Sequence, residues 1–288
     1  MENIGLRPRG ILRIIQPEPV IEGAGVKLRR SIATSTLNYL DPFLLLDHFA
    51  SNDRHDYEAG FPMHPHRGIE TVTYMLSGAV HHRDTLGNSG TIGAGDIQWM
   101  TSGGGIMHEE MPQVRPEGID GFQLWVNLPA KLKMSRPRYQ DIQAKQVPAV
   151  QRADGATVRV IAGTVDGIRG PVTGIAADPV YLDILVPPQT GFTQPVAKGH
   201  SAFSYVFEGK ANFVDRDGTV ISHPTLVIWE DGDYIQVHTG ADSVRFLLVS
   251  GKPLHEPVAR YGPFVMNTRE EIEQALEDLR RGTFVWKD

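Results

Sequence analysis

The chain has 288 residues, of which 41% are hydrophobic and 22% charged, and its formal net charge is −6. An acidic balance without any basic tract argues against nucleic acid or an anionic membrane surface as a partner. The chain contains no cysteine, which excludes disulfides, zinc–thiolate sites, iron–sulfur clusters and thiol catalysis.

The length of the chain and its apolar runs indicate the number of domains and the kind of protein. A chain of this length is expected to form two domains. The stretch before Pro17 lacks the apolar core of a signal peptide. The densest apolar run, FLLL at 43–46, is far too short to span a bilayer. We therefore expect a soluble, cytoplasmic protein.

Strand-like segments recur along the chain, rich in β-branched or aromatic residues and separated by clusters of Gly, Pro or Asp. This spacing favours an all-β sandwich or barrel over alternating strands and helices. The predicted strands are 43–49, 70–76, 122–128, 180–186, 203–209, 225–229 and 244–251.

Two histidines stand at the entrance of the second of these strands, in FPMHPHRGIETVTYML (61–76). His64 and His66 are two positions apart, so their side chains point to one face of an extended segment. If the alternation continues unbroken, Glu70 shares that face with Val72, Tyr74 and Leu76. Such a face belongs to a core, and two buried imidazoles aimed at one point suit a metal ion.

A second pair of this kind follows in TSGGGIMHEEMP (101–112), where His108 and Glu110 are again two positions apart. The three glycines before them let backbone pass close to a crowded site. A lone histidine is more often a hydrogen-bonded core or surface residue. Two same-face pairs in one half of the chain instead predict a metal site of three imidazoles and one carboxylate.

The two halves of the chain resemble each other. YMLSG (74–78) followed by AGDIQW (94–99) is matched by YVFEG (205–209) followed by DGDYIQ (231–236). Each time, a strand ending in glycine is followed by Gly-Asp and another strand, as expected for two barrels that arose by duplication. The polar, proline-punctuated segment 134–150 is predicted to be the linker between them.

One helix is predicted, over residues 268–281. Thr268 and Glu271 form a capping box. Apolar residues then recur at helical spacing up to Leu279, and Gly282 provides the stop.

Several segments together resemble the pirin family of the cupin superfamily. They are LDPFLLLDHF (40–49), FPMHPHRGIETVTYML (61–76), GDIQWMTSGGGIMHEEMP (95–112), FQLWVNLPAKLKM (122–134) and GPFVMNTREEI (262–272). The resemblance implies a bicupin of two face-to-face jelly-roll barrels. We predict a metal-binding barrel at 1–133 and a second barrel at 151–288 that ends in the helix.

The resemblance also implies a ligand set for one metal ion in the first barrel, namely His64, His66, His108 and Glu110. Glu70 is the second choice as a carboxylate ligand. Otherwise it is expected to be a neighbour of the ligands that hydrogen-bonds to them without contacting the ion. Fe(II) is the expected ion, and Mn, Co, Ni, Cu or Zn also suit such donors.

The second half lacks these residues. Aligning the strands that end in glycine places Pro195 and Ala197 opposite His64 and His66, and Ser201 opposite Glu70. Aligning the Gly-Asp pairs places Arg245 and Leu247 opposite His108 and Glu110. We therefore predict a second barrel without a metal site.

The activity implied by the resemblance is that of a quercetin 2,3-dioxygenase, which uses dioxygen to cleave the central ring of a flavonol. Glu110 is the predicted catalytic residue, taking the proton of the flavonol 3-hydroxyl. The alternative is an iron-binding, redox-responsive regulator that acts by binding a partner protein. A monomer is expected, and the sequence assigns no substrate-binding residues.

Overall fold

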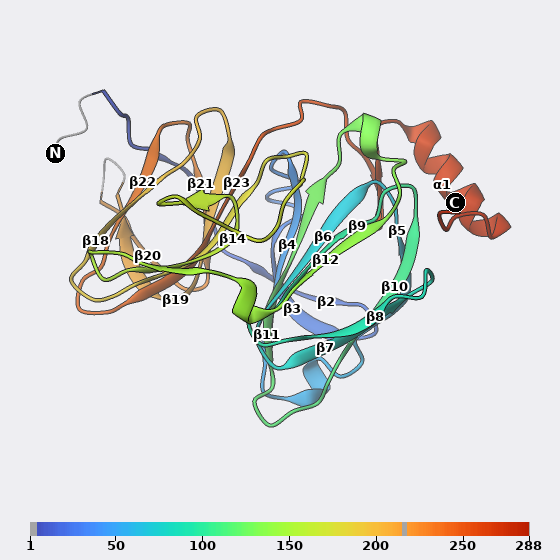
Figure 1. The fold of residues 1–288 in the computed structure, drawn as a ribbon, viewed down its shortest axis with the longest axis horizontal. Coiled ribbons are helices and arrows are strands. Elements are labelled where there is room, and N and C mark those ends of the chain that lie inside the picture. Colours follow the sequence, from blue (N-terminus) through green and yellow to red (C-terminus); the bar gives the residue numbers. More distant parts are fainter. Residues whose placement is uncertain (1–4, 215–217, 288) are drawn as a thin grey trace. The chain divides into compact units, whose positions relative to one another are not determined.

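The computed structural model of the chain describes residues 5–214 and 218–287 (Figure 1). Strands dominate these residues, and the single α-helix described among them, α1 (Arg269–Arg281), lies near the C-terminal end. The predicted all-β class with a short C-terminal helix is confirmed. No helix in the described part of the chain is long and apolar enough to cross a membrane.

The chain forms two compact units whose bounds differ from the predicted domains. Of the described residues, 18–144 and 254–287 form the N-terminal unit, and 5–17 and 145–253 form the C-terminal unit. Each end of the chain thus belongs to the unit formed mainly by the other half of the sequence. Strand β1 (Ile11–Ile15) pairs with a strand of the C-terminal unit, and α1 packs within the N-terminal unit.

The N-terminal unit consists of two antiparallel sheets, as in a cupin barrel. One has the strand order β12-β9-β6-β11-β4-β3-β2 and the other the order β5-β10-β7-β8. The strands are β2 (Glu18–Glu22), β3 (Val26–Ile32), β4 (Phe43–Ser51), β5 (Phe61–His66), β6 (Ile69–Ser77), β7 (Ala79–Asp84), β8 (Ser89–Gly93), β9 (Ile97–Thr101), β10 (Ile106–Pro112), β11 (Ile119–Asn127) and β12 (Arg138–Ile142). A small hairpin of β24 (Ala259–Tyr261) and β25 (Phe264–Met266) and the 3₁₀ turns Arg54–Asp56 and Ala130–Leu132 complete the unit.

Strand β12 corrects the predicted linker, because it falls inside 134–150 and pairs with β9. It is an edge strand, and none of its five residues is fully buried. An edge strand that buries neither face carries no clear apolar alternation, so the sequence pattern did not reveal it.

A turn between β5 and β6 corrects the predicted run of alternation from His64 to Leu76. The chain turns at Gly68, whose φ is +79° and where a Cβ would overlap the carbonyl oxygen of Val265. Strand β5 then belongs to the four-stranded sheet and β6 to the seven-stranded sheet. The face that carries the histidines therefore cannot be followed into β6 by counting residues.

The C-terminal unit repeats this architecture. Its long sheet has the order β1-β21-β19-β23-β17-β14-β13, with β18, β20 and β22 joined to it through β19 and β22. The strands are β13 (Ala149–Gln151), β14 (Thr157–Ala162), β15 (Thr164–Val165), β16 (Ile168–Arg169), β17 (Val180–Val186), β18 (Gly191–Pro195), β19 (Ser201–Phe213), β20 (Val220–Ser222), β21 (Thr225–Trp229), β22 (Tyr234–His238) and β23 (Val244–Gly251). A 3₁₀ turn, Ala144–Gln146, precedes β13.

The matching strand orders identify the counterparts of the two halves. β19, β23 and β17 correspond to β6, β11 and β4, and the pair β18–β22 corresponds to the pair β5–β10. Placing Arg245 and Leu247 opposite His108 and Glu110 was therefore wrong, because β23 takes the place of β11. The true counterpart of β10 is β22, whose buried residues are Ile235 and Val237.

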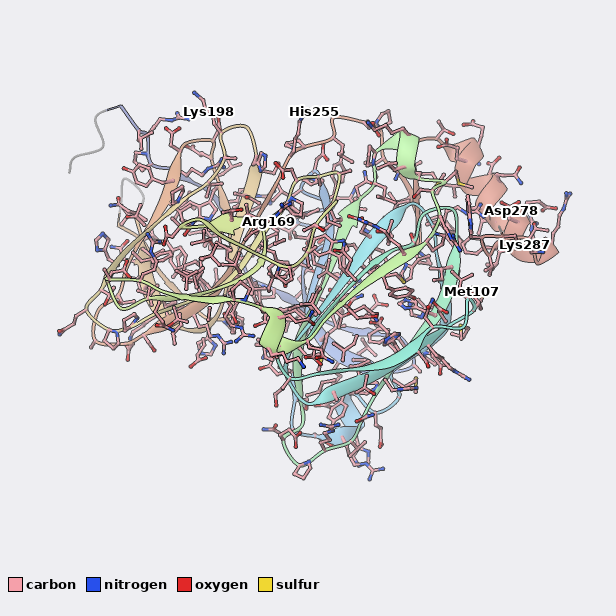
Figure 2. The ribbon with its side chains drawn as sticks, in the orientation of Figure 1. Met107, Arg169, Lys198, His255, Asp278 and Lys287 are labelled. Atoms are coloured by element: carbon pink, nitrogen blue, oxygen red, sulfur yellow. The ribbon has the colours of Figure 1, made fainter. Side chains whose placement is uncertain are left out.

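Helix α1 begins and ends as predicted. The Thr268 hydroxyl accepts a hydrogen bond from the backbone N–H of Glu271, and the Glu271 carboxylate accepts one from the backbone N–H of Thr268. Gly282 ends the helix at φ 70°. On α1, Asp278 (Figure 2) forms an ion pair with the buried Arg67, which directly precedes the turn after β5. The helix thus stabilises the segment next to His66.

Candidate metal centre

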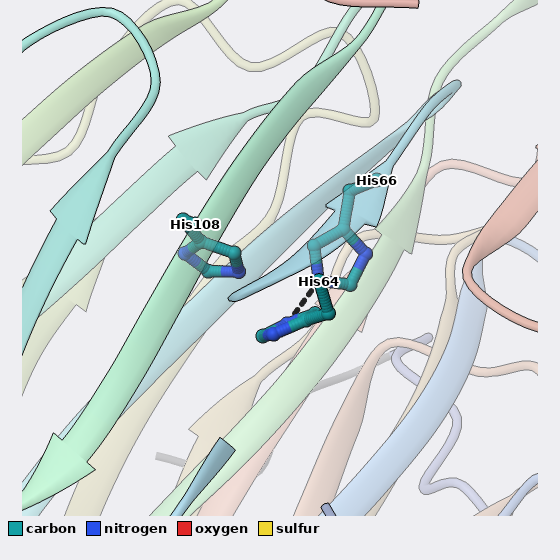
Figure 3. A group of neighbouring side chains, drawn as sticks. All are labelled: His64, His66 and His108. Carbon is teal, nitrogen blue, oxygen red and sulfur yellow. Dashed lines mark hydrogen bonds between the residues drawn. The ribbon is translucent and has the colours of Figure 1, made fainter. Parts of the chain in front are cut away.

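Three imidazoles meet inside the N-terminal unit (Figure 3). His64 and His66 lie on β5 and His108 on the neighbouring β10, where His108 pairs directly with His64. The Nε2 atoms of His64 and His66 are 3.0 Å apart. One ring nitrogen from each of the three lies within 4.8 Å of those of the other two. Antiparallel pairing of two short strands is thus what brings the histidines together.

The chemistry of the three rings fits a divalent metal ion. Burial lowers the pKa of His66 and of His108 well below the ordinary value, with nearby histidines adding to the effect. Both rings are therefore neutral at pH 7, the form that binds metal. Three ring nitrogens have no hydrogen-bond partner among the described residues: both nitrogens of His108 and Nδ1 of His66. Buried nitrogens without a partner are costly, and coordination would satisfy them.

Glu110, the fourth predicted ligand, lies outside the group of three imidazoles. A bulge in the β5–β10 pairing follows His108 and places Glu110 opposite Phe61. The Glu110 carboxylate accepts a hydrogen bond of 3.0 Å from the Thr73 hydroxyl. Burial raises the pKa of Glu110, and the positive potential of His64 opposes that rise. The structure therefore brings three of the four predicted ligands together and gives Glu110 a partner of its own.

Thr73 and Gln123 are site residues that the sequence pattern missed. The Thr73 hydroxyl lies 3.0 Å from Oε1 of Glu110 and 2.7 Å from Oε1 of Gln123. A hydroxyl has one proton and cannot donate to both. The hydroxyl therefore donates to one of the two oxygens at a time, and Thr73 holds the side chains of Glu110 and Gln123 next to each other. Thr73 and Gln123 lie on central strands of the larger sheet, and only the fold reveals that they face the histidines.

Glu70 has different partners from those predicted. It is three positions before Thr73 on β6, so its side chain points to the opposite face of the sheet. There its carboxylate accepts a hydrogen bond of 2.8 Å from the Thr101 hydroxyl. The turn at Gly68 explains the difference, because the side-chain alternation of β5 does not continue through the turn into β6.

We expect Glu70 to make the stability of the protein depend on pH. Burial raises its pKa from 4.5 to about 7, so between these values the folded state holds a proton that the unfolded state has lost. The contribution of Glu70 to the free energy of unfolding therefore falls as pH rises through this window and is constant above it. Glu70→Gln is expected to raise the free energy of unfolding by about 3 kcal/mol at pH 8, and by less than about 0.5 kcal/mol at pH 4.5.

Urea denaturation of both proteins at several pH values measures this difference. Glu273→Gln, at an exposed position of α1, is the matched control and should show no such trend. If the free energies of unfolding of Glu70→Gln and wild type differ by the same amount at pH 4.5 and pH 8, the prediction is contradicted.

Two of the imidazoles, His64 and His66, line a cavity of about 560 Å³ inside the N-terminal unit. Its wall is mostly apolar and includes Leu45, Phe49 and Trp125. The Trp125 ring meets the ring of His66 edge to face, with centroids 5.2 Å apart. A largely apolar cavity of this size with a few polar groups is typical of a small-molecule site.

The core of the C-terminal unit is apolar. A continuous cluster of buried apolar side chains packs there and includes Phe192, Phe213, Trp229 and Phe246. The buried residues of β22, Ile235 and Val237, belong to the same cluster. Strand β22 thus contributes apolar side chains to its unit, whereas its counterpart β10 carries His108 and Glu110.

Comparisons with known proteins agree with this architecture. The Pirin family matches residues 25–126, and the Pirin C-terminal cupin domain matches residues 181–285. The chain belongs to the pirin family. It is 45% identical to a pirin-like protein of Caulobacter vibrioides, over 96% of this chain and 99% of that one. It is 44% identical to human pirin, over 90% of this chain and 88% of the human protein.

A solved structure is also similar. The crystal structure of a quercetin 2,3-dioxygenase from Acinetobacter baumannii has a TM-score of 0.87 and 35% sequence identity. The match covers 96% of this chain and 99% of that one. The predicted family and the predicted fold of two cupin-like halves are thus confirmed.

Proposed function

We propose that this pirin is a metal-dependent dioxygenase that cleaves a flavonol such as quercetin. The observation that carries the proposal is the group of three imidazoles, of which His64 and His66 line a cavity of about 560 Å³. Metal ligands beside a cavity of this kind suit a planar aromatic substrate. The similar quercetin 2,3-dioxygenase of Acinetobacter baumannii supports this choice of substrate class.

In this proposal His64, His66 and His108 hold the ion, most suitably Fe(II), with Mn, Co, Ni, Cu or Zn also compatible with nitrogen donors. The bound ion would supply the redox chemistry toward dioxygen that no amino-acid side chain provides. Glu110 lies next to this group in the cavity wall and is available as a further ligand or as a base.

Glu110 is the residue we assign to proton transfer. Its raised pKa brings it closer to neutrality, where a carboxylate can take the proton of a phenolic hydroxyl and later return it. The Thr73 hydroxyl holds the carboxylate in place and can give or accept the proton of the hydrogen bond. Deprotonation of the 3-hydroxyl makes the flavonol electron-rich and prepares it for oxidation.

The test is oxygen uptake by metal-loaded protein on addition of quercetin. We expect one dioxygen consumed for each flavonol lost, since a dioxygenase places both oxygen atoms in the product. Metal-free protein is the control and should show no uptake above background. Flavonol binding without oxygen uptake would instead favour the alternative, an iron-binding, redox-responsive regulator that acts on a partner protein.

A further inference from the structure

A cluster of four charged side chains lines the same cavity and has no part in holding the ion. Glu22, Arg30 and Asp47 come from β2, β3 and β4, and Arg260 comes from β24. The Arg30 guanidinium donates to both oxygens of Asp47, at 2.8 and 2.7 Å, and to Oε1 of Glu22 at 2.7 Å. We call these four residues the charged wall.

Arg260 connects the charged wall to the imidazoles. Its guanidinium lies over the ring of Trp125, 5.1 Å from the centroid, and the same ring contacts His66. Arg260 donates to the carbonyl oxygens of Gly262 and Leu44 through Nε and Nη1. Its Nη2 makes no hydrogen bond to the described residues, so it can donate into the cavity.

The charges of the wall balance. Burial raises the pKa of Asp47 to about 6, against the lowering effect of Arg30, so the carboxylate is mostly ionised at pH 7. Two carboxylates then face two guanidinium groups. A carboxylate ligand would meet repulsion from Glu22 and Asp47, and an ammonium would meet repulsion from the two arginines. A hydroxyl both donates and accepts hydrogen bonds, so it is the group that suits such a wall.

We propose that the charged wall binds two neighbouring hydroxyl groups on the ring of the aromatic substrate that lies farthest from the imidazoles. One hydroxyl donates to a carboxylate oxygen of Glu22 or Asp47, and the other accepts from Nη2 of Arg260. Trp125 lies between the two ends and supports the rings. This inference rests on the proposed aromatic substrate and adds the feature by which the substrate is selected.

The test compares the affinities of two flavonols for metal-loaded protein without oxygen, by titration calorimetry. Quercetin carries neighbouring hydroxyls on its phenyl ring, and galangin is the same flavonol without them. We expect wild type to bind quercetin about tenfold more tightly or better, because hydrogen bonds to charged groups are the strong ones. Arg260→Met and Glu22→Gln should each reduce that ratio to about threefold or less, while galangin binds as before.

Arg83→Met is the matched control. Arg83 also forms an ion pair with a glutamate, Glu109, but it is exposed and does not line the cavity, so the ratio should remain that of wild type. Equal affinity of wild type for the two flavonols would overturn the inference. A preference that persists in both variants, or failure of both flavonols to bind, would also overturn it. The affinities are measured without oxygen. If wild type prefers quercetin to galangin but takes up no oxygen with quercetin, the result contradicts the proposed dioxygenase function and leaves this inference in place.

Discussion

Replacing His108 with alanine is expected to weaken metal binding by about 100-fold or more and to abolish oxygen uptake. Loss of a residue that only hydrogen-bonds to a metal ligand already lowers metal affinity by about 10- to 100-fold. Loss of a ligand itself is expected to lower it further. Metal content after dialysis, measured by elemental analysis, should fall from about one ion per chain to near zero. The fold should persist, because the β5–β10 pairing depends on backbone hydrogen bonds.

Thermal unfolding separates this effect from general damage. Neither nitrogen of His108 has a hydrogen-bond partner within residues 5–214 and 218–287, so the variant removes a poorly satisfied buried group and leaves no partner unpaired. We therefore expect its metal-free free energy of unfolding to lie within about 1 kcal/mol of wild type. Added metal at 100 times its dissociation constant should stabilise wild type by about 2.7 kcal/mol and the variant hardly at all.

His81→Ala is the matched control for His108→Ala. His81 lies on β7, next to β10, but its side chain is exposed. It should keep the metal content and the metal-induced stabilisation of wild type. Full metal content in His108→Ala would refute the assignment of the three imidazoles.

The three imidazoles were predictable because their spacing is local. His64 and His66 share a face through strand alternation alone, and the segment with His108 carries the same spacing. The capping box of Thr268 and Glu271 is local in the same way. Features of this kind depend only on a few consecutive residues, so the sequence is enough to predict them.

The surroundings of the imidazoles were not predictable, because they depend on pairing between distant strands. Thr73 and Gln123 are 50 positions apart in sequence and meet only when β6 pairs with β11. Glu70 was placed on the wrong face because Gly68 breaks the chain into two strands. The exchange of chain ends between the units, through β1 and α1, likewise has no local signal.

Replacing Glu110 with glutamine is expected to lower kcat for flavonol cleavage by 10²- to 10⁴-fold, the usual contribution of a positioned base. Glutamine has nearly the same shape, and its carbonyl oxygen can still accept from the Thr73 hydroxyl, but it cannot take a proton. Metal content should remain near one per chain, since the three imidazoles are unchanged. The dissociation constant for quercetin without oxygen should change by less than about threefold.

Glu109→Gln is the control for Glu110→Gln, because it makes the same chemical change one position away. Glu109 points to the other side of β10, where it pairs with Arg83, so kcat should stay at the wild-type value. A Glu110→Gln protein that has lost its metal would show that the carboxylate holds the ion as a fourth ligand. A variant with wild-type kcat would exclude Glu110 as the base. The bound metal and the rate must therefore be measured on the same sample, since only a low rate with full metal content assigns proton transfer to Glu110.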